Sequence, residues 1–339
     1  MKIDYYCFVM DNFGQKDYSN LMARYGAHIF ENMDFDVATA KSLGKFAVFC
    51  KETQKFYDDS WQEINLNGKV VLPRCIIPET KTLFDAIEAQ GALSLESKED
   101  FVATQNWPAL IHPIYREVIP TTYGEFLENF EEYKKKFGRV FFKTAKKHIS
   151  CEVRQVMSLN DSIFAFVEDD DDLLNDKKKE SKISEKMYLV FTNQSLHSND
   201  HRFNFLPKDA NVYVQPYLEI VKDEQYSNIP VEYRSFVVDG KFTTSRSWVP
   251  NREVPETVVE MTQQIIDAMP ERTSKTFVVD VLQFVDENGQ THYDLCELNP
   301  ISSSGYEQGS SIFLLEDGLA PERKFYPKCD SVSEEVSES

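Results

Sequence analysis

The sequence TFVVDVLQFVDENGQTHYDLCELN occupies residues 276–299 and has the pattern of two β-strands joined by a turn. The turn is predicted at residues 286–289, because Asn and Gly tolerate positive φ. Asp280 interrupts the first apolar run, and Glu297 follows the second, with Asn299 two residues later. Residues two apart on a strand share a face, so Glu297 and Asn299 point to the same side. If Asp280 joins them across the hairpin, two carboxylates and an amide converge as hard oxygen ligands suited to Mg²⁺. The alternative is the polar face of an ordinary surface hairpin.

Composition restricts the classes of protein to which the chain can belong. Its 339 residues suffice for two domains or one multi-lobed unit, and its net charge of −19 argues against a general nucleic-acid binder. Six cysteines without a C-x-x-C pair indicate neither a zinc site nor a disulfide framework. The first residues lack the apolar core of a signal peptide, and no run of about 18 apolar residues could cross a bilayer. We therefore expect a cytoplasmic protein without a membrane segment.

Residues 1–110 mix strand and helix patterns. Runs of β-branched and aromatic residues predict strands at residues 5–10, 46–50 and 70–77. Apolar residues at helical spacing predict a helix near residues 80–90, with Gly91 as its C-terminal cap. Neither G-x-G-x-x-G nor G-x-x-x-x-G-K occurs, so this α/β domain has no phosphate loop of those types.

A helix is predicted after the proline-rich boundary at residues 107–120. Thr122 and Glu125 have the spacing of a capping box, in which each side chain bonds a backbone N–H at the start of the helix. Four aromatic residues then recur at spacings of about one turn, and Gly138 ends the pattern; they are Phe126, Phe130, Tyr133 and Phe137.

Lys143 closes the apolar run that follows this helix. A lysine in this place is unusual, because a buried ammonium must be paired or meet an anion. The alternative is a strand edge from which the charge reaches water along a flexible side chain.

Residues 169–184, DDDDLLNDKKKESKIS, are charge-dense and nearly free of apolar side chains, which predicts a flexible loop. Their aspartates lack the spacing of a calcium loop, so we do not expect a functional metal there. His197 and His201 stand four apart without a third ligand nearby, which favours surface histidines.

Residues 212–248 carry the next group of polar positions in strand patterns. Glu232 and Arg234 lie two apart on one strand and share a face. The dipeptide at 239–240, Asp-Gly, predicts a two-residue hairpin leading to a strand that contains Arg246. A weak ion pair on an exposed face is the alternative to a binding role. Pro255 then begins a predicted helix with an apolar stripe, closed by a second proline.

This order of motifs resembles the ATP-grasp superfamily over roughly residues 75–307. The resemblance rests on a strand ending in lysine, the segment Gln-Pro-Tyr-Leu-Glu, and three motifs in sequence, E-x-R-x-F-V-V-D-G-K, V-x-D-V and E-x-N-P, at residues 232–241, 278–281 and 297–300. Compact carboxylate–amine ligase-like members, including some of bacterial and phage modification systems, and the eukaryotic cell-division-cycle ATP-grasp assembly factors carry similar motifs. The resemblance implies an α/β (α+β) fold in which two α+β lobes clasp a nucleotide after a small α/β domain. Domains are then expected at residues 1–110, 111–210 and 211–328, with a disordered acidic tail at 329–339.

The resemblance also implies roles for individual residues. Lys143 would reach the α- and β-phosphates of ATP, with Lys146 as a further phosphate contact, and Arg234 would face the γ-phosphate or an acyl-phosphate. Arg246 would assist it or bind a substrate carboxylate. Mg²⁺ would be held by Asp280, Glu297 and Asn299. The nucleobase and ribose would be met by residues between the lobes, which are Gln215, Pro216, Tyr217, Leu218 and Glu219.

Two functions are open from the sequence. The first is an ATP- and Mg²⁺-dependent ligase that activates a carboxylate for attack by an amine or similar nucleophile, with a peptide or protein among its candidate substrates. The second is an assembly factor that holds ATP while binding a client protein, without turnover. One departure from the superfamily affects both: residues 144–150, TAKKHIS, lack the glycines of its usual phosphate flap.

Overall fold

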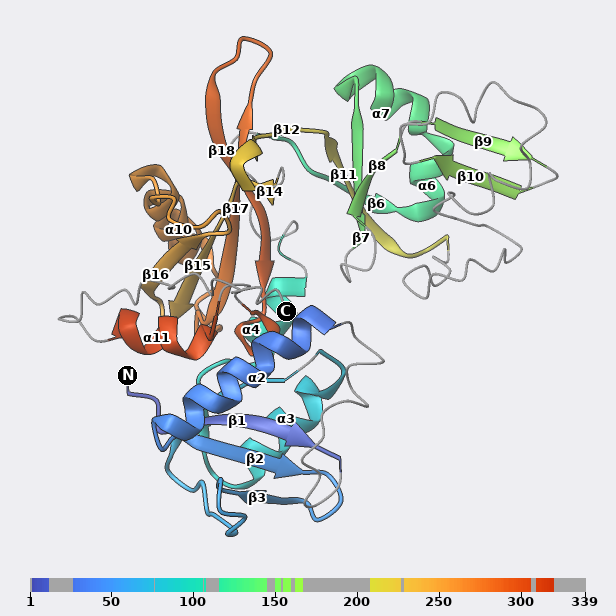
Figure 1. Ribbon diagram of the computed structural model, residues 1–339. Helices are drawn as coiled ribbons and strands as arrows, with labels where there is room; N and C mark the ends of the chain where they lie inside the picture. Colours follow the sequence, from blue (N-terminus) through green and yellow to red (C-terminus); the bar gives the residue numbers. More distant parts are fainter. Residues whose placement is uncertain are drawn as a thin grey trace, which may run out of the picture.

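The computed structural model describes residues 2–11, 27–75, 77–105, 107, 116–144, 150–153, 155–159, 162–166, 208–226, 229–305 and 309–319. Its architecture mixes α-helices with parallel and antiparallel sheets (Figure 1). None of the helices in these ranges is long and apolar enough to cross a membrane.

The N-terminal unit is an α/β layer built on a five-stranded sheet in the order β3-β2-β1-β4-β5. Its strands are β1 (Tyr5–Met10), β2 (Phe46–Cys50), β3 (Lys55–Tyr57), β4 (Val70–Pro73) and β5 (Leu93–Ser94). All neighbours are parallel except β2 and β3. Its helices are α2 (Ala27–Ser42), α3 (Ile77–Ala89) and α4 (Lys98–Gln105). The strands predicted at residues 5–10 and 46–50 are confirmed.

The strand predicted at residues 70–77 is too long. β4 ends at Pro73, and α3 already begins at Ile77. Pro78 follows in the first turn of the helix, where a missing N–H costs nothing because the first N–H groups of a helix have no intrahelical partner. The C-terminal end of α3 agrees with the predicted glycine cap, since Gly91 has a φ of 71°, a conformation that favours glycine.

A second unit contains a four-stranded sheet in the order β6-β11-β7-β8. Its strands are β6 (Ile119–Thr122), β7 (Val140–Thr144), β8 (Ser150–Val153) and β11 (Asn211–Pro216). A separate antiparallel pair is formed by β9 (Gln155–Leu159) and β10 (Ser162–Phe166). We refer to residues 116–216 as the first lobe.

The aromatic helix of the first lobe is two helices rather than one. α6 (Tyr123–Glu128) starts with the predicted capping box of Thr122 and Glu125, and α7 (Phe130–Phe137) follows after Asn129. The backbone of Asn129 leaves the helical region, with φ −108° and ψ 16°, and its side-chain Nδ2 donates to the Glu125 carbonyl at 2.9 Å. Phe126 and Phe130 remain buried, so the break does not disturb the apolar face.

The third unit, which we call the second lobe, is organised by an antiparallel sheet in the order β12-β17-β15-β16, with β18 on β17. Its strands are β12 (Glu219–Ile220), β15 (Glu232–Val238), β16 (Lys241–Ser247), β17 (Phe277–Val285) and β18 (Thr291–Asn299). Around it lie β13 (Lys222–Asp223), η1 (Glu224–Tyr226), β14 (Ile229–Pro230), α10 (Glu256–Ala268), η2 (Ile301–Ser303) and α11 (Ser311–Leu319). Both predicted hairpins are confirmed.

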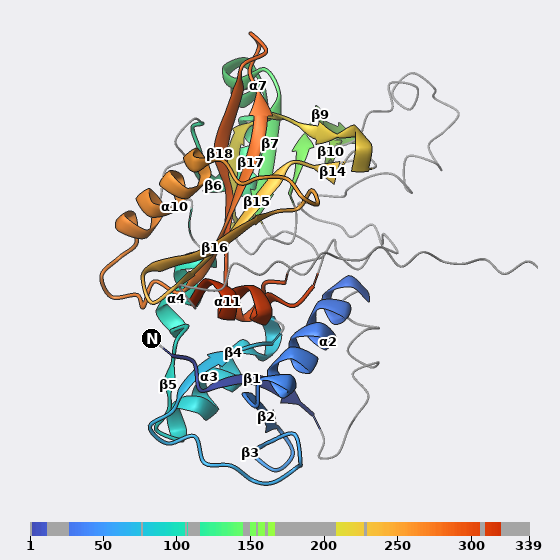
Figure 2. The same ribbon diagram turned by 60° about the vertical axis from the view of Figure 1, so that its left-hand side comes forward.

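The two faces of this sheet pack on different partners. Alternate residues of β15 and β17, among them Tyr233 and Val279, belong to the core under α10. Their neighbours Phe236 and Val278 belong instead to a core that extends into the N-terminal unit through β1 and α11. In both ribbon views α11 lies between the sheet and α2, while α10 covers the opposite side (Figures 1 and 2). The N-terminal unit and the second lobe thus share one hydrophobic core.

Candidate functional site

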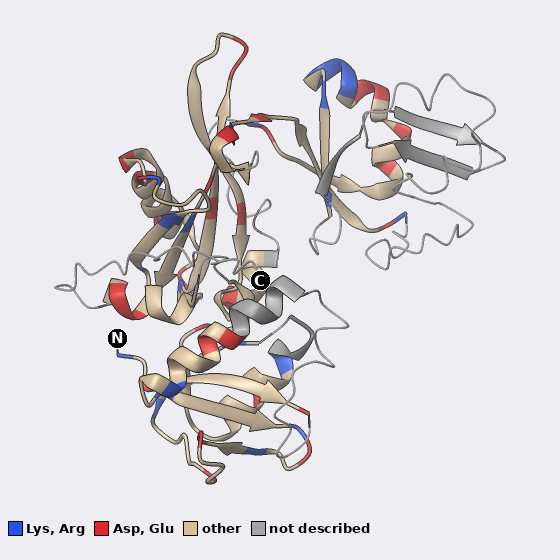
Figure 3. Ribbon diagram, viewed as in Figure 1, with Lys and Arg blue, Asp and Glu red and all other residues tan. Residues whose placement is uncertain are grey.

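A row of four charged residues crosses the second-lobe sheet from strand to strand. Arg246 of β16 is opposite Arg234 of β15, Arg234 is opposite Asp280 of β17, and Asp280 is opposite Glu297 of β18. Directly opposed residues in an antiparallel sheet have their side chains on the same face. The acidic positions of β17 and β18 lie next to each other in the charge-coloured view (Figure 3). The row therefore has two positive charges followed by two negative charges.

A β-bulge at Cys296 brings Glu297 onto this face. Asp280 pairs with Glu297, whereas its neighbour Val281 pairs with Leu295, so Cys296 is the extra residue of β18. With Cys296 in regular pairing, Glu297 would be opposite Val279 on the face covered by α10. Bulges that redirect a side chain are common beside functional sites.

Arg234 and Asp280 form a bidentate pair in the middle of the row. Arg234 Nε and Nη2 donate to Asp280 Oδ1 and Oδ2, each at 2.7 Å, and Asp280 is fully buried. Burial lowers the pKa of Arg234, but the charge of Asp280 raises it above the usual arginine value. Asn299 Nδ2 donates to Asp280 Oδ2 at 2.6 Å and to Glu297 Oε1 at 3.0 Å. The three predicted metal ligands are thus brought together.

Lys143 reaches this cluster from the first lobe. Its Nζ lies 3.1 Å from Glu297 Oε2 and donates to the Cys296 carbonyl at 3.0 Å. Burial lowers the pKa of Lys143, but Glu297 raises it, and the net shift is above the usual lysine value. Lys143 therefore carries its charge at neutral pH and is paired with Glu297 in this structure.

Glu232 belongs to the same cluster, although the sequence suggested only an ion pair with Arg234. Burial and the charge of Asp280 raise the pKa of Glu232 to about 8. The carboxylates of Glu232, Asp280 and Glu297 thus lie near the cations Lys143 and Arg234, with Arg246 on the same face of the sheet. No sequence signal distinguished this role of Glu232, because its environment depends on β17 and β18.

The donor set of the cluster fits a magnesium ion. Asp280, Glu297 and Asn299 offer carboxylate and amide oxygens, the ligands that Mg²⁺ prefers. A carboxylate has about four lone-pair sites, so Asp280 can accept from Arg234 and still bind a cation. Burial and then the charges of Asp280 and Glu297 raise the pKa of Glu232, and a cation bound here would relieve the repulsion among these carboxylates. Within the described residues, no group of three or more His, Cys, Asp and Glu side chains is arranged for a metal, so a site here depends on the amide of Asn299.

The predicted nucleobase segment lies where the chain passes from the first lobe to the second. Gln215 and Pro216 pair with β7 at the end of β11, and Glu219 pairs with β17 in β12. Gln215 is buried, whereas Glu219 is exposed. Arg139 stacks on the Tyr217 ring at 3.8 Å, and its Nη1 lies 2.8 Å from Glu219 Oε2. Leu218, which stands between Tyr217 and Glu219 in the chain, is half-buried.

A second ion pair links the two lobes and was not predicted from the sequence. Arg116, at the start of the first lobe, is buried and pairs through Nε with Asp294 Oδ2 of β18 at 3.1 Å. Its Nη2 donates to the Leu295 carbonyl. Neither residue belongs to a motif, so no pattern in the chain identified the pair.

Several predicted features lie outside the described residues. These are Lys146, the acidic segment 169–184, His197, His201 and the tail 329–339. Among the described side chains, the cysteines at 7, 50, 75 and 296 are free thiols.

Solved structures similar to this chain are ATP-grasp ligases. D-alanyl-alanine synthetase A from Vibrio cholerae is 11% identical, with a TM-score of 0.44 and 94% of each chain covered. ATP-grasp ligase PsnB complexed with precursor peptide PsnA2 and AMPPNP is 13% identical, with a TM-score of 0.40, covering 94% of this chain and 100% of PsnB. N5-carboxyaminoimidazole ribonucleotide synthetase from Thermotoga maritima is 11% identical, with a TM-score of 0.40, covering 88% of this chain and 68% of that one.

No protein-family model matches the chain, and no curated protein matches it. A likeness as distant as that to these ligases assigns no role to any residue. The roles of the residues must therefore follow from the geometry of the site.

Proposed function

We propose that this protein has an ATP-grasp fold and is an ATP- and Mg²⁺-dependent ligase that activates a carboxylate and joins it to an amine or a similar nucleophile. The observation that carries this proposal is the convergence of Lys143, from the first lobe, on Glu297 beside Asp280 and Asn299. A cation from one lobe and hard oxygen ligands from the other are what a metal–triphosphate complex between them requires.

The residues have separate roles in the proposed reaction. Lys143 would bind the α- and β-phosphates as a point charge on a flexible stem. Asp280, Glu297 and Asn299 would hold Mg²⁺, which when bound neutralises charge on the phosphates. The segment 215–219 would receive the nucleobase and ribose at the junction of the lobes.

Arg234 and Arg246 would act at the γ-phosphate and the carboxylate. They are directly opposed on β15 and β16, which places two guanidinium groups on one face of the sheet. A carboxylate oxygen of the substrate would attack the γ-phosphorus of ATP. The bond between the γ-phosphorus and the oxygen of the leaving ADP would break, which gives an acyl-phosphate and ADP. The nucleophile would then attack the acyl carbon, lose a proton and release phosphate.

The test combines nucleotide binding with turnover. Purified protein should bind ATP more tightly with Mg²⁺ than in EDTA, and a library of carboxylate and amine substrates, peptides included, should yield ADP and phosphate with one pair. Loss of the magnesium effect in Asp280→Asn would support the assigned ligands. A wild-type protein that binds ATP equally with and without Mg²⁺ would contradict the proposal. ATP binding without turnover, together with one co-purifying protein, would instead support an assembly factor.

A further inference from the structure

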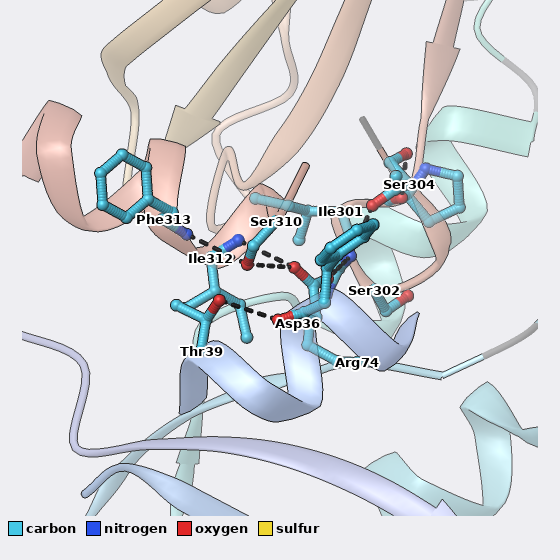
Figure 4. A network of polar contacts seen from close by, with 12 residues as sticks. Asp36, Thr39, Arg74, Ile301, Ser302, Ser304, Ser310, Ile312 and Phe313 are labelled. Carbon is cyan, nitrogen blue, oxygen red and sulfur yellow. Dashed lines mark hydrogen bonds and ion pairs between the residues drawn. The ribbon is translucent and has the colours of Figure 1, made fainter. Parts of the chain in front are cut away.

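A buried ion pair in the N-terminal unit reaches the loop that follows the metal ligands (Figure 4). Arg74, just after β4, donates through Nε to Asp36 Oδ2 of α2 at 3.0 Å, and Nη2 donates to the same oxygen. Both side chains are buried, with 3% of Arg74 and none of Asp36 exposed. Two charges in such a place must be held by specific partners.

Most partners of Arg74 are backbone groups of residues 300–305, which we call the site loop. Arg74 Nη1 donates to the Ile301 carbonyl, and Nη2 donates to the Ser304 carbonyl at 2.6 Å. The sequence of the loop is PISSSG, with only one large apolar side chain to hold it by packing. The loop therefore depends on hydrogen bonds for its conformation.

Two more residues of the N-terminal unit bind the same loop. Glu96 accepts from the backbone N–H of Ile301 at 2.9 Å and of Ser302 at 3.0 Å. The N–H of Cys75 donates to the Ser302 carbonyl at 2.8 Å. The N-terminal unit thus holds both the donors and the acceptors of the loop backbone.

The site loop connects these contacts to the charged cluster. It starts directly after Asn299, a predicted metal ligand, and its Gly305 carbonyl accepts from Arg234 Nη1 at 2.6 Å. The other two nitrogens of Arg234, Nε and Nη2, donate to Asp280. A shift of the loop would therefore move Asn299 at one end and Arg234 at the other.

Asp36 fixes the opposite side of Arg74. Its Oδ1 accepts from Ser310 Oγ at 2.7 Å and from the N–H of Ile312 at 3.1 Å, both at the start of α11. The planar guanidinium of Arg74 can reach one carboxylate and two carbonyls at once, which a lysine ammonium with its different geometry cannot do.

We infer that Arg74 and Asp36 are positioning residues that act through the site loop to set Asn299 and Arg234 for the metal–nucleotide complex. This inference rests on the proposed function and deepens it, because it makes the N-terminal unit a part of the ATP site. Residues behind the direct ligands of a metal commonly change its affinity by 10-fold to 100-fold when they are replaced.

The experiment measures ATP affinity by calorimetry, with Mg²⁺ and in EDTA, for the full chain and for Arg74→Lys. The variant should lower the ratio of the two affinities about tenfold, because binding in EDTA loses only the contribution of Arg234, while Lys143 and the segment 215–219 are untouched. Hydrogen exchange without nucleotide should become faster at the amides of residues 301 and 302. Asp36→Asn, which keeps the shape of the side chain, should act in the same direction if Arg74→Lys does not fold.

Glu316→Gln is the matched control. Glu316 of α11 accepts from Tyr6 Oη and from Lys45 Nζ, both at 2.6 Å, so it joins the same two units through other contacts. This control should leave both the affinity ratio and the exchange of the site loop at wild-type values. A folded Arg74→Lys protein with the wild-type ratio and wild-type exchange would overturn the inference. Absence of a magnesium effect in the wild type would instead contradict the proposed function, and the exchange comparison would still decide whether Arg74 positions the loop.

Discussion

Arg234 and Asp280 are directly opposed on β15 and β17, and the guanidinium meets both carboxylate oxygens at 2.7 Å. This pair occupies the centre of the charged row and also holds the site loop through the Gly305 carbonyl. It is therefore both a structural element and a part of the candidate site. The two roles can be separated by measurement.

The first prediction concerns the stability of this pair. Asp280→Asn leaves a buried guanidinium without its counter-charge, so the free energy of unfolding should fall by about 3 kcal/mol. Arg234→Gln should cost a similar amount for the converse reason. The double variant should lose clearly less than the sum of the two, because it leaves no uncompensated charge. Urea unfolding of the four proteins gives the comparison, and additive losses would contradict a direct coupling.

The second prediction concerns Lys143 and Glu297, which neutralise each other in the structure. Under the proposed function, ATP would compete with Glu297 for Lys143, and Mg²⁺ would compete with Lys143 for Glu297. Glu297→Gln should therefore strengthen ATP binding in EDTA several-fold, since Lys143 loses its competing partner. The same variant should weaken binding in the presence of Mg²⁺ by about 10-fold to 100-fold, since a ligand is lost.

Lys143→Met is the companion variant, because it keeps the length of the side chain. It should weaken ATP binding with and without Mg²⁺ alike. Calorimetry under both conditions distinguishes the two variants by the sign of the change in EDTA. Equal weakening in EDTA for both would show that Glu297 does not restrain Lys143.

The sequence predicted Asp280, Glu297 and Asn299 as metal ligands, but it could not predict the bulge that brings Glu297 to the face of Asp280. In a regular strand, Glu297 would lie on the same face as Leu295, which packs in the core under α10, because residues two apart share a face. Only the extra residue Cys296 turns Glu297 toward Asp280. A bulge depends on the pairing of two strands, so a single strand pattern does not reveal it.

The contribution of the N-terminal unit was also beyond the sequence. Asp36 and Arg74 are far apart in the chain and belong to no motif. Arg74 lay inside the strand predicted at residues 70–77, whereas β4 ends one residue before it. Arg74 makes long-range contacts with Ile301 and Ser304, and Asp36 makes them with the start of α11. By contrast, the Asp239-Gly240 turn was predictable, since both residues adopt positive φ, 53° and 68°, and the local sequence suffices for that.

The third prediction concerns the pH dependence of stability. Complete burial raises the pKa of Glu96 from 4.5 to about 8, although hydrogen bonds from Ser302 and Ile301 favour the ionised form. The unfolded chain releases this proton near pH 4.5, whereas the folded protein keeps it until about pH 8. The stability that Glu96 contributes is thus complete below pH 4.5 and is lost as pH rises toward 8.

Glu96→Gln tests this dependence, because its side chain does not titrate. Between pH 5 and pH 8 the wild-type unfolding free energy should fall more steeply than that of the variant. Urea unfolding at several pH values provides both slopes. Parallel curves would show that Glu96 is ionised in the folded protein across the whole range.

The fourth prediction concerns Arg246, whose position opposite Arg234 places two guanidinium groups on one face of the sheet. If the pair serves the γ-phosphate, Arg246→Gln should reduce the preference for ATP over ADP, lowering ATP affinity about tenfold and leaving ADP affinity nearly unchanged. Arg252→Gln is the control, because Arg252 bonds Tyr233 Oη and Gln283 Oε1, whose strand positions lie on the α10 face. This control should leave the ratio of ATP to ADP affinity at its wild-type value.

A loss of affinity for both nucleotides in Arg246→Gln would place the side chain near the α- or β-phosphate, whereas no change for either would assign it to the carboxylate substrate.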